Sequence, residues 1–397
     1  MSLTDIETKY AGRRGAIFRL ALVSGILTVL TLGFYRFWMK TRLRRYYWSA
    51  IRPGGTPLEY VGEPLEKLLG FLVAVVFMAF YIGVVNLVLM YFSFSLFQGN
   101  FVAYGLSFAG ILPIIFFAQY RARRYVLART RWRGIRFGQE PGAWGYTWRA
   151  ALHWIITICT LGALWPRMSF WLEKYRVDHS YFGAQRLVQG GRWTMLLKAM
   201  KHVYLGLGVT AVALLVAVLG EIPWAFLVLF VSLPWSLFGL AYWRACSFRL
   251  LTNAKSIGEI GFRASPRSGR VFAIYMFGYA LTFLSVALGA LLVLAGAFLT
   301  VGEARLAEVA DMLSTAGGAS DIPTWMLSGL ALALYFGAFI FWGVLGHVFV
   351  KMPLARHFTE TIEIVNAHAL SGIGQRARDE FAEAEGFADA LDVGAAI

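Results

Sequence analysis

The stretch TLGFYRFWMKTRLRRYY, residues 31–47, joins the end of an apolar segment to a run of basic and aromatic residues. Residues 17–38 are apolar enough for a membrane helix, and basic residues typically end such a helix at the membrane surface. A related transition occurs at Arg121-Ala122-Arg123-Arg124-Tyr125, directly after another apolar segment. These two transitions indicate a chain built from apolar helices with basic ends.

The composition of the whole chain agrees with a multi-span membrane protein. Of its 397 residues, 58% are hydrophobic and only 15% are charged, whereas soluble domains carry about 25% charged residues. The apolar runs are continuous and do not alternate, which disfavours a membrane β-barrel. Eight segments approach the roughly 20 residues that cross a bilayer. They are residues 17–38, 68–96, 101–120, 150–172, 202–220, 222–245, 271–299 and 325–350.

The distribution of the 37 Lys and Arg residues predicts the topology. If all eight segments cross, the two sides carry 16 and 21 of these residues, which gives no bias. If residues 17–38 and 150–172 instead enter and leave on one face, 36 cations lie on that side and only Arg305 lies opposite. Positive residues prefer the cytoplasmic side of short loops. We therefore expect six crossings, both termini in the cytoplasm, and two re-entrant or interfacial helices.

The two segments that we expect not to cross, residues 17–38 and 150–172, resemble each other, which indicates an internal repeat. Gly15 and Gly145 stand shortly before them, each apolar run has Thr-Leu-Gly near its end (residues 31–33 and 160–162), and basic residues lie at both ends. Pro166 adds a helix breaker to the second. An ordinary span with unusual flanks is the alternative for both segments.

Short stretches with β-branched and aromatic residues around Gly or Pro follow the basic ends and predict small cytoplasmic β hairpins. They lie near residues 54–60, 130–137, 180–184, 253–262 and 359–364. Because an isolated hairpin is marginally stable, we expect these hairpins to pair with one another. The expected fold class is an all-α polytopic membrane protein with such hairpins. Residues 1–373 would form the membrane domain, and residues 374–397 an acidic C-terminal tail.

Basic residues at the ends of the apolar segments are candidates for binding anionic lipid headgroups or another anionic ligand. These are Arg36, Lys40, Arg42, Arg44, Arg45, Arg121, Arg123, Arg124, Lys174, Arg176, Arg244 and Arg249. Amphipathic aromatic residues nearby are candidates for the headgroup level. They are Tyr35, Trp38, Tyr46, Trp48, Tyr125, Trp132, Trp148 and Trp171. The same pattern also fits a generic topology signal and anchor. Nucleic acid is not an expected partner, because the cations flank membrane segments.

No catalytic pattern is visible, so we do not expect an enzyme, a cofactor or a metal site. The six histidines have no paired-ligand spacing, and there is no GxSxG, Walker or Rossmann glycine motif. The apolar segments are nearly free of ionisable side chains, which argues against a proton relay. Two cysteines, Cys159 and Cys246, give no disulfide framework.

The string TLGxYRFWxKxRLRRY, with Gly12-Arg13-Arg14-Gly15 before it, resembles the YjgN-like bacterial inner-membrane family, a family of unknown function. The resemblance covers about residues 12–373 and implies the bacterial cytoplasmic membrane. It supplies no reaction and no catalytic residues.

Two functions remain open at this point. One is binding or transport of lipid, or of another apolar molecule with an anionic head. The other is a non-catalytic scaffold or regulator of a partner membrane protein, such as a protease.

Overall fold

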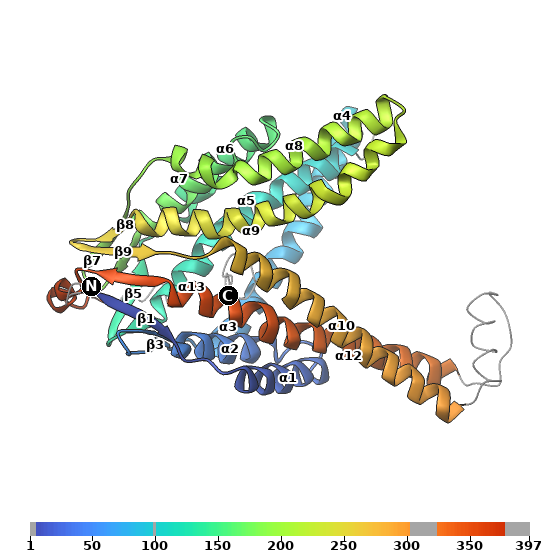
Figure 1. The fold of residues 1–397 in the computed structure, drawn as a ribbon, viewed down its shortest axis with the longest axis horizontal. Coiled ribbons are helices and arrows are strands. Elements are labelled where there is room, and N and C mark those ends of the chain that lie inside the picture. Colours follow the sequence, from blue (N-terminus) through green and yellow to red (C-terminus); the bar gives the residue numbers. More distant parts are fainter. Residues whose placement is uncertain (1–4, 98–100, 302–323, 378–397) are drawn as a thin grey trace. The chain divides into compact units, whose positions relative to one another are not determined.

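The computed structural model describes residues 5–97, 101–301 and 324–377 (Figure 1). The chain divides into two compact units. The first comprises residues 1–12, 40–272 and 355–397, and the second comprises residues 13–39 and 273–354. The α-helices are α1 (Arg14–Leu30), α2 (Arg36–Ala50), α3 (Pro64–Phe80), α4 (Asn86–Phe97), α5 (Phe101–Ala128), α6 (Ala143–Cys159), α7 (Trp165–Asp178), α8 (Leu197–Leu219), α9 (Leu229–Asn253), α10 (Ser268–Val301), α12 (Thr324–Gly346) and α13 (Met352–Glu360). Shorter helical turns are η1 (Tyr81–Val85), η2 (Trp193–Leu196), η3 (Pro223–Val228), η4 (His347–Lys351) and η5 (Ala367–Gly372).

All ten strands join one antiparallel sheet in the first unit, in the order β2-β1-β10-β9-β8-β7-β6-β5-β4-β3. The strands are β1 (Ile6–Tyr10), β2 (Ile51–Pro53), β3 (Leu58–Tyr60), β4 (Thr130–Trp132), β5 (Ile135–Gln139), β6 (Ser180–Phe182), β7 (Gln185–Gln189), β8 (Lys255–Ile257), β9 (Ile260–Ala264) and β10 (Ile362–Val365). The expectation of an all-α fold is therefore wrong. Short strands with unpaired edges gain their hydrogen bonds only from one another, and here they form a single sheet.

The sheet is almost closed on itself, because its two terminal strands, β2 and β3, contact each other. The first strand of the chain pairs with the last, with Ile6 opposite Ile364. Buried side chains from several strands form a common core with η5. Its buried residues are Trp132, Phe182, Ile257, Ile260, Ile364, Ala367, Leu370 and Ile373. The first and last strands, β1 and β10, thus join β2 to β9 and complete the sheet that the internal hairpins begin.

Three of the expected hairpins are present: β4–β5, β6–β7 and β8–β9. The first has a two-residue loop, Arg133-Gly134, with positive φ at both positions, as a tight hairpin turn requires. The hairpin expected at residues 54–60 is wrong, because β2 and β3 do not pair as ladder neighbours. The strand expected after residue 359 is β10, which pairs with β9 and β1.

The two segments expected not to cross, residues 17–38 and 150–172, both reverse direction at their Thr-Leu-Gly sequence, and the two turns are alike. Gly33 N–H donates to Thr28 O at 2.7 Å, and Gly162 N–H donates to Thr157 O at 2.8 Å. In the second segment, α6 packs against α7 as a helical hairpin. In the first, the Thr28 hydroxyl lies 3.9 Å from Met39 Sδ, so the chain has returned past its turn.

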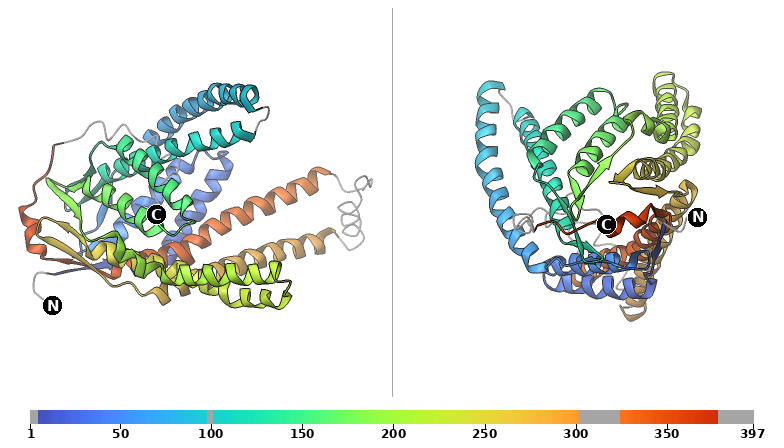
Figure 2. Two further views of the ribbon diagram at one scale, coloured as in Figure 1. Left: turned by 90° about the horizontal axis from the view of Figure 1, so that it is seen from above. Right: turned by 90° about the vertical axis from the view of Figure 1, so that its left-hand side faces the viewer.

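Five helical stretches in the described part of the chain are long and apolar enough to cross a membrane. They are Pro64–Leu96, Trp193–Leu219, Pro223–Asn253, Ser268–Gly296 and Ser328–Glu360. The sixth expected span, residues 101–120, lies in the helix α5 and is not among these five. Figure 2 shows α8 and α9 side by side from two directions. Most of the proposed acidic tail, from residue 378 onward, lies outside the described residues.

Candidate anionic-lipid interface

Two of the candidate cations donate hydrogen bonds to the ends of strands. Arg124 Nε donates to the carbonyl oxygen of Gln139 at 3.0 Å, and Lys174 Nζ donates to that of Gln189 at 2.7 Å. The two pairs occupy equivalent places, because α5 and α7 each lead into a hairpin whose second strand ends in the glutamine. A charge-assisted bond of this kind stabilises a strand end more than a neutral one does. Arg124 and Lys174 are therefore structural residues as well as cations.

Arg44 and Arg45 have a similar role near β3. Arg44 is only 4% exposed, and its guanidinium lies 5.2 Å from the ring centroid of Tyr60 and 6.0 Å from that of Trp48. Arg45 Nη2 donates to Gly62 O at 2.9 Å. Cation–π contacts are stronger when the cation is removed from water. Arg44 thus contributes to packing and does not present its charge to a membrane surface.

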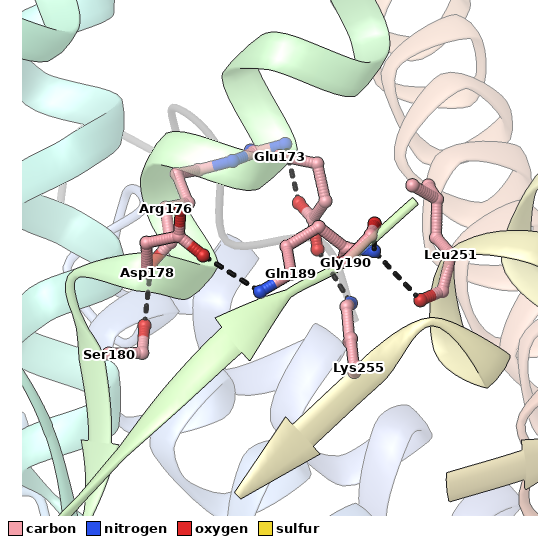
Figure 3. A network of polar contacts seen from close by, with 8 residues as sticks. All are labelled: Glu173, Arg176, Asp178, Ser180, Gln189, Gly190, Leu251 and Lys255. Carbon is pink, nitrogen blue, oxygen red and sulfur yellow. Dashed lines mark hydrogen bonds and ion pairs between the residues drawn. The ribbon is translucent and has the colours of Figure 1, made fainter. Parts of the chain in front are cut away.

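A polar network joins α7 to β7 and β8 (Figure 3). At its centre, the Glu173 carboxylate accepts from Lys255 Nζ at 2.8 Å and from Arg176 Nη2 at 2.9 Å. Beside it, Lys174 lies 2.9 Å from Asp178, and the second oxygen of Asp178 accepts from the Gln189 backbone N–H at 2.7 Å. The Gln189 amide continues the network to the backbone oxygens of Gly190 and Leu251.

The charge balance keeps Glu173 ionised. Burial raises its pKa, but Lys255, Arg176 and Arg123 together outweigh burial and hold the pKa well below its ordinary value. Burial also lowers the pKa of Arg123, which the Glu173 carboxylate partly offsets. Glu173 therefore neutralises cations that converge on this part of the sheet. Sequence reasoning did not select Glu173, although it directly precedes the candidate cation Lys174.

The candidate aromatic residues divide by exposure. Tyr125 and Trp132 are buried and belong to the protein interior. Trp148 is 79% exposed and Trp171 is 41% exposed, both on the α6–α7 hairpin. The remaining four have intermediate exposure: Tyr35 and Trp38, whose rings stack with centroids 6.1 Å apart, and Tyr46 and Trp48.

Several candidate cations remain on the surface. Arg36 is exposed in the second unit, and Arg42, Arg45, Arg244 and Arg249 are exposed in the first. Arg121 and Lys40 are partly exposed, and Arg121 lies 5.3 Å from the Phe117 ring. Arg123 and Arg176 belong to the surroundings of Glu173.

The α8–α9 pair carries exposed cations near one end and exposed apolar side chains along its length. A Cβ at Gly239 would lie 2.9 Å from the backbone of His202 and Val203, so the two helices touch at this level. Arg244 is exposed five residues later on α9, and Lys198 and Lys201 are exposed near the start of α8. The sequence analysis missed these two lysines, although they directly precede the apolar segment 202–220.

Aromatic rings accompany these cations at the same level. Lys201 Nζ lies 5.3 Å from the centroid of the Tyr242 ring. The His202 ring is within 5.9 Å of Trp235 and 4.6 Å of Tyr242, measured between centroids. Between residues 179 and 258 the sequence has one acid, Glu221, which lies at the opposite end of the helix pair. Cations and amphipathic rings below an uncharged helical surface are the arrangement that binds anionic headgroups.

Among residues 5–97, 101–301 and 324–377, no group of three or more His, Cys, Asp or Glu is placed to hold a metal ion.

These features define a polytopic helical membrane protein whose helices extend from a ten-stranded sheet. The chain belongs to a family described as bacterial proteins of unknown function (DUF898), which matches residues 5–390. This confirms the resemblance drawn from residues 12–46.

The chain is also similar to the inner membrane protein YjgN of Salmonella typhimurium (strain LT2), with 28% identity over 141 residues. The match covers 34% of this chain and 33% of the relative, so only about a third of the relative's length is matched. No solved structure matches the chain. Together with the five apolar helices, this relative supports a bacterial inner-membrane protein.

Proposed function

We propose that this protein binds anionic phospholipid headgroups in the leaflet next to its β-sheet, with both termini in the cytoplasm. The observation that carries the proposal is the α8–α9 pair. It places Lys198, Lys201 and Arg244 directly beneath exposed apolar helix surface, and Glu221, its one acid, lies at the far end. Lipid phosphates would contact the cations, and acyl chains would lie along the apolar surface above them.

The electrostatic contribution sets the expected size of the effect. Each cation near an anionic membrane surface contributes about 1 kcal/mol. Removing two of them should therefore weaken preferential binding by about 2 kcal/mol, or roughly 30-fold. Arg124, Lys174 and Arg176 would contribute little to lipid binding, because they already donate to backbone carbonyls and a carboxylate.

The test compares variants of equal charge in nanodiscs that contain phosphatidylglycerol and phosphatidylcholine. Lys201→Gln with Arg244→Gln should reduce enrichment of phosphatidylglycerol around the protein, measured by native mass spectrometry or by spin-labelled lipids. Arg186→Gln with Arg263→Gln is the matched control, because both arginines are exposed on the sheet and pair with Glu140 and Glu363. Equal enrichment for both double variants would contradict the proposal.

Lipid movement between leaflets is a separate property, which a dithionite quenching assay in sealed vesicles of the same lipids would measure. The scaffold role makes a different prediction. It expects no preference among headgroups, together with a membrane-protein partner that remains crosslinked to the chain after purification from native membranes.

A further inference from the structure

Three connections between consecutive helices place a non-glycine residue in the left-handed region. The residues are Leu32 (φ 52°), Leu161 (φ 48°) and Glu221 (φ 52°). Leu32 and Leu161 occupy the turns of the α1–α2 and α6–α7 connections, and Glu221 lies between α8 and η3. The backbone conformation is the same at all three positions. It therefore does not explain why two of them carry leucine and the third carries glutamate.

Leucine is an unexpected choice for such a turn in water. The left-handed conformation costs an ordinary residue free energy, and glycine or asparagine adopts it more readily. Leu32 is nevertheless 92% exposed and Leu161 is 96% exposed, so neither packs against the protein. The remaining positive-φ residues in the described chain that are not glycine, Arg133 and Asn366, are polar. An exposed leucine at this position fits an apolar surrounding.

The heights of the two hairpins in the first unit can be compared directly. The Tyr204 hydroxyl donates to Ala163 O, in the α6–α7 turn, at 2.7 Å. This contact places the turn level with the lower part of α8. From Tyr204, α8 continues to Leu219, which is about 22 Å at 1.5 Å per residue. The hydrocarbon of a bilayer is about 30 Å thick. The α6–α7 hairpin thus ends most of a bilayer short of the α8–α9 turn.

We propose that the α6–α7 hairpin is a one-leaflet element. Its tip residue, Leu161, lies among the acyl chains of the leaflet next to the sheet, just beneath the headgroups. Glu221 lies in water on the opposite face, because the longer α8–α9 hairpin crosses. Lys201, just before Tyr204, marks where the uncharged part of α8 begins, at the level of the hairpin tip. This inference does not depend on which headgroup the protein prefers.

The α1–α2 connection has the same turn, with matching hydrogen bonds at Gly33 and Gly162. The Thr31 hydroxyl accepts from Tyr35 N–H at 2.9 Å, and the Thr160 hydroxyl accepts from Leu164 N–H at 3.4 Å. We extend the proposal to Leu32 on this ground. Each short hairpin would then occupy one leaflet with a single exposed leucine at its tip.

Site-directed labelling in sealed vesicles of known orientation tests the proposal. Single cysteines at positions 161, 221 and 133 are made by Leu161→Cys, Glu221→Cys and Arg133→Cys in a background with Cys159→Ala and Cys246→Ala. A charged maleimide should label the Glu221→Cys protein from one side and the Arg133→Cys protein from the other. The Leu161→Cys protein should show no labelling above the cysteine-free background from either side.

A depth measurement completes the test and guards against loss of labelling through misfolding. Bimane is attached to Leu161→Cys in detergent, and the protein is then reconstituted with spin-labelled lipids. Spin labels near the acyl carbonyls should quench it more than labels at the chain ends. Labelling from the Glu221 side would show that the hairpin crosses. Labelling from the Arg133 side without quenching would show that the tip stands in water. Either result overturns the proposal. The native Cys159, exposed on α6, offers a second reporter in a Cys246→Ala protein.

Discussion

Replacing Glu173 by glutamine should destabilise the junction between α7 and the sheet. The carboxylate is bound by Lys255 at 2.8 Å and Arg176 at 2.9 Å, and its side chain is 16% exposed. Removing one partner of a buried ion pair costs about 3–5 kcal/mol, because the remaining charge is left without compensation. Lys255 and Arg176 here keep some access to solvent, which reduces the penalty. We therefore expect a loss of about 2–3 kcal/mol in the free energy of unfolding.

The matched control is Glu363→Gln on β10. Glu363 pairs with Arg263 at 3.4 Å, and the two side chains are 38% and 62% exposed. An exposed pair of this kind contributes about 0–1 kcal/mol. Each variant removes one carboxylate that pairs with a cation of the sheet, Lys255 on β8 or Arg263 on β9, so the two differ mainly in burial. Denaturant unfolding in detergent gives the two free energies, and hydrogen exchange of α7 and β8 locates the change. Losses of equal size in the two variants would refute the reasoning.

The pH dependence of the Glu173 contribution follows from the direction of its pKa. Since the folded pKa lies below the ordinary value of 4.5, the carboxylate stabilises the fold fully above that value. The contribution is lost as the pH falls from about 4.5 toward the lower folded pKa. The difference in stability between the wild type and Glu173→Gln should therefore be constant near neutral pH and shrink below about pH 4. A difference that grows on acidification would contradict this assignment.

Two further predictions concern helix packing and the hairpin tip. Gly239→Leu should separate α8 from α9 and cost about 1–3 kcal/mol, because the added Cβ would lie 2.9 Å from the backbone of α8; Gly208→Leu, with nothing within 4 Å of the added Cβ, should be nearly neutral in thermal unfolding. Leu161→Asn should relax the left-handed backbone by about 1 kcal/mol in water. It should nevertheless lower stability in nanodiscs, where holding an amide among the acyl chains costs about 1–3 kcal/mol. Glu221→Asn, at the same backbone conformation in water, should not lower stability in nanodiscs, and a stabilising Leu161→Asn would argue for a tip in water.

The local features of the fold could be predicted from the sequence. Apolar length marks the long helices, and the repeated Thr-Leu-Gly marks two turns that prove to share their hydrogen bonds. The short loop at Arg133-Gly134 marks a hairpin, because few sequences suit two consecutive positive φ angles. In each case the signal lies within a few residues of the structure that it specifies.

The closed arrangement of the sheet could not be predicted in this way. Nothing near Ile6 indicates that it lies opposite Ile364, since the pairing depends on which strand edges remain free after the rest of the sheet has formed. The same limit applies to the cations. Arg124 and Lys174 bind backbone carbonyls. Every residue has such a carbonyl, so the sequence does not show that these two cations have partners within the protein. One signal was available, because each cation precedes the glutamine whose carbonyl it binds by the same number of residues.

The position of Glu173 also bears on where lipid would bind. Glu173 stands where Arg123 stands one repeat earlier, since Lys174 and Arg124 have equivalent partners. A second arginine there would meet Arg176, Lys255 and Arg123, and their repulsion would oppose closure of the sheet. The carboxylate removes that repulsion, and it also makes these cations unavailable to phosphate. Around Lys198 and Lys201 the sequence between residues 179 and 258 has a single acid, Glu221, at the far end of α8. Anionic lipid should therefore concentrate at α8–α9 and be depleted beside α7, although both regions are rich in basic residues.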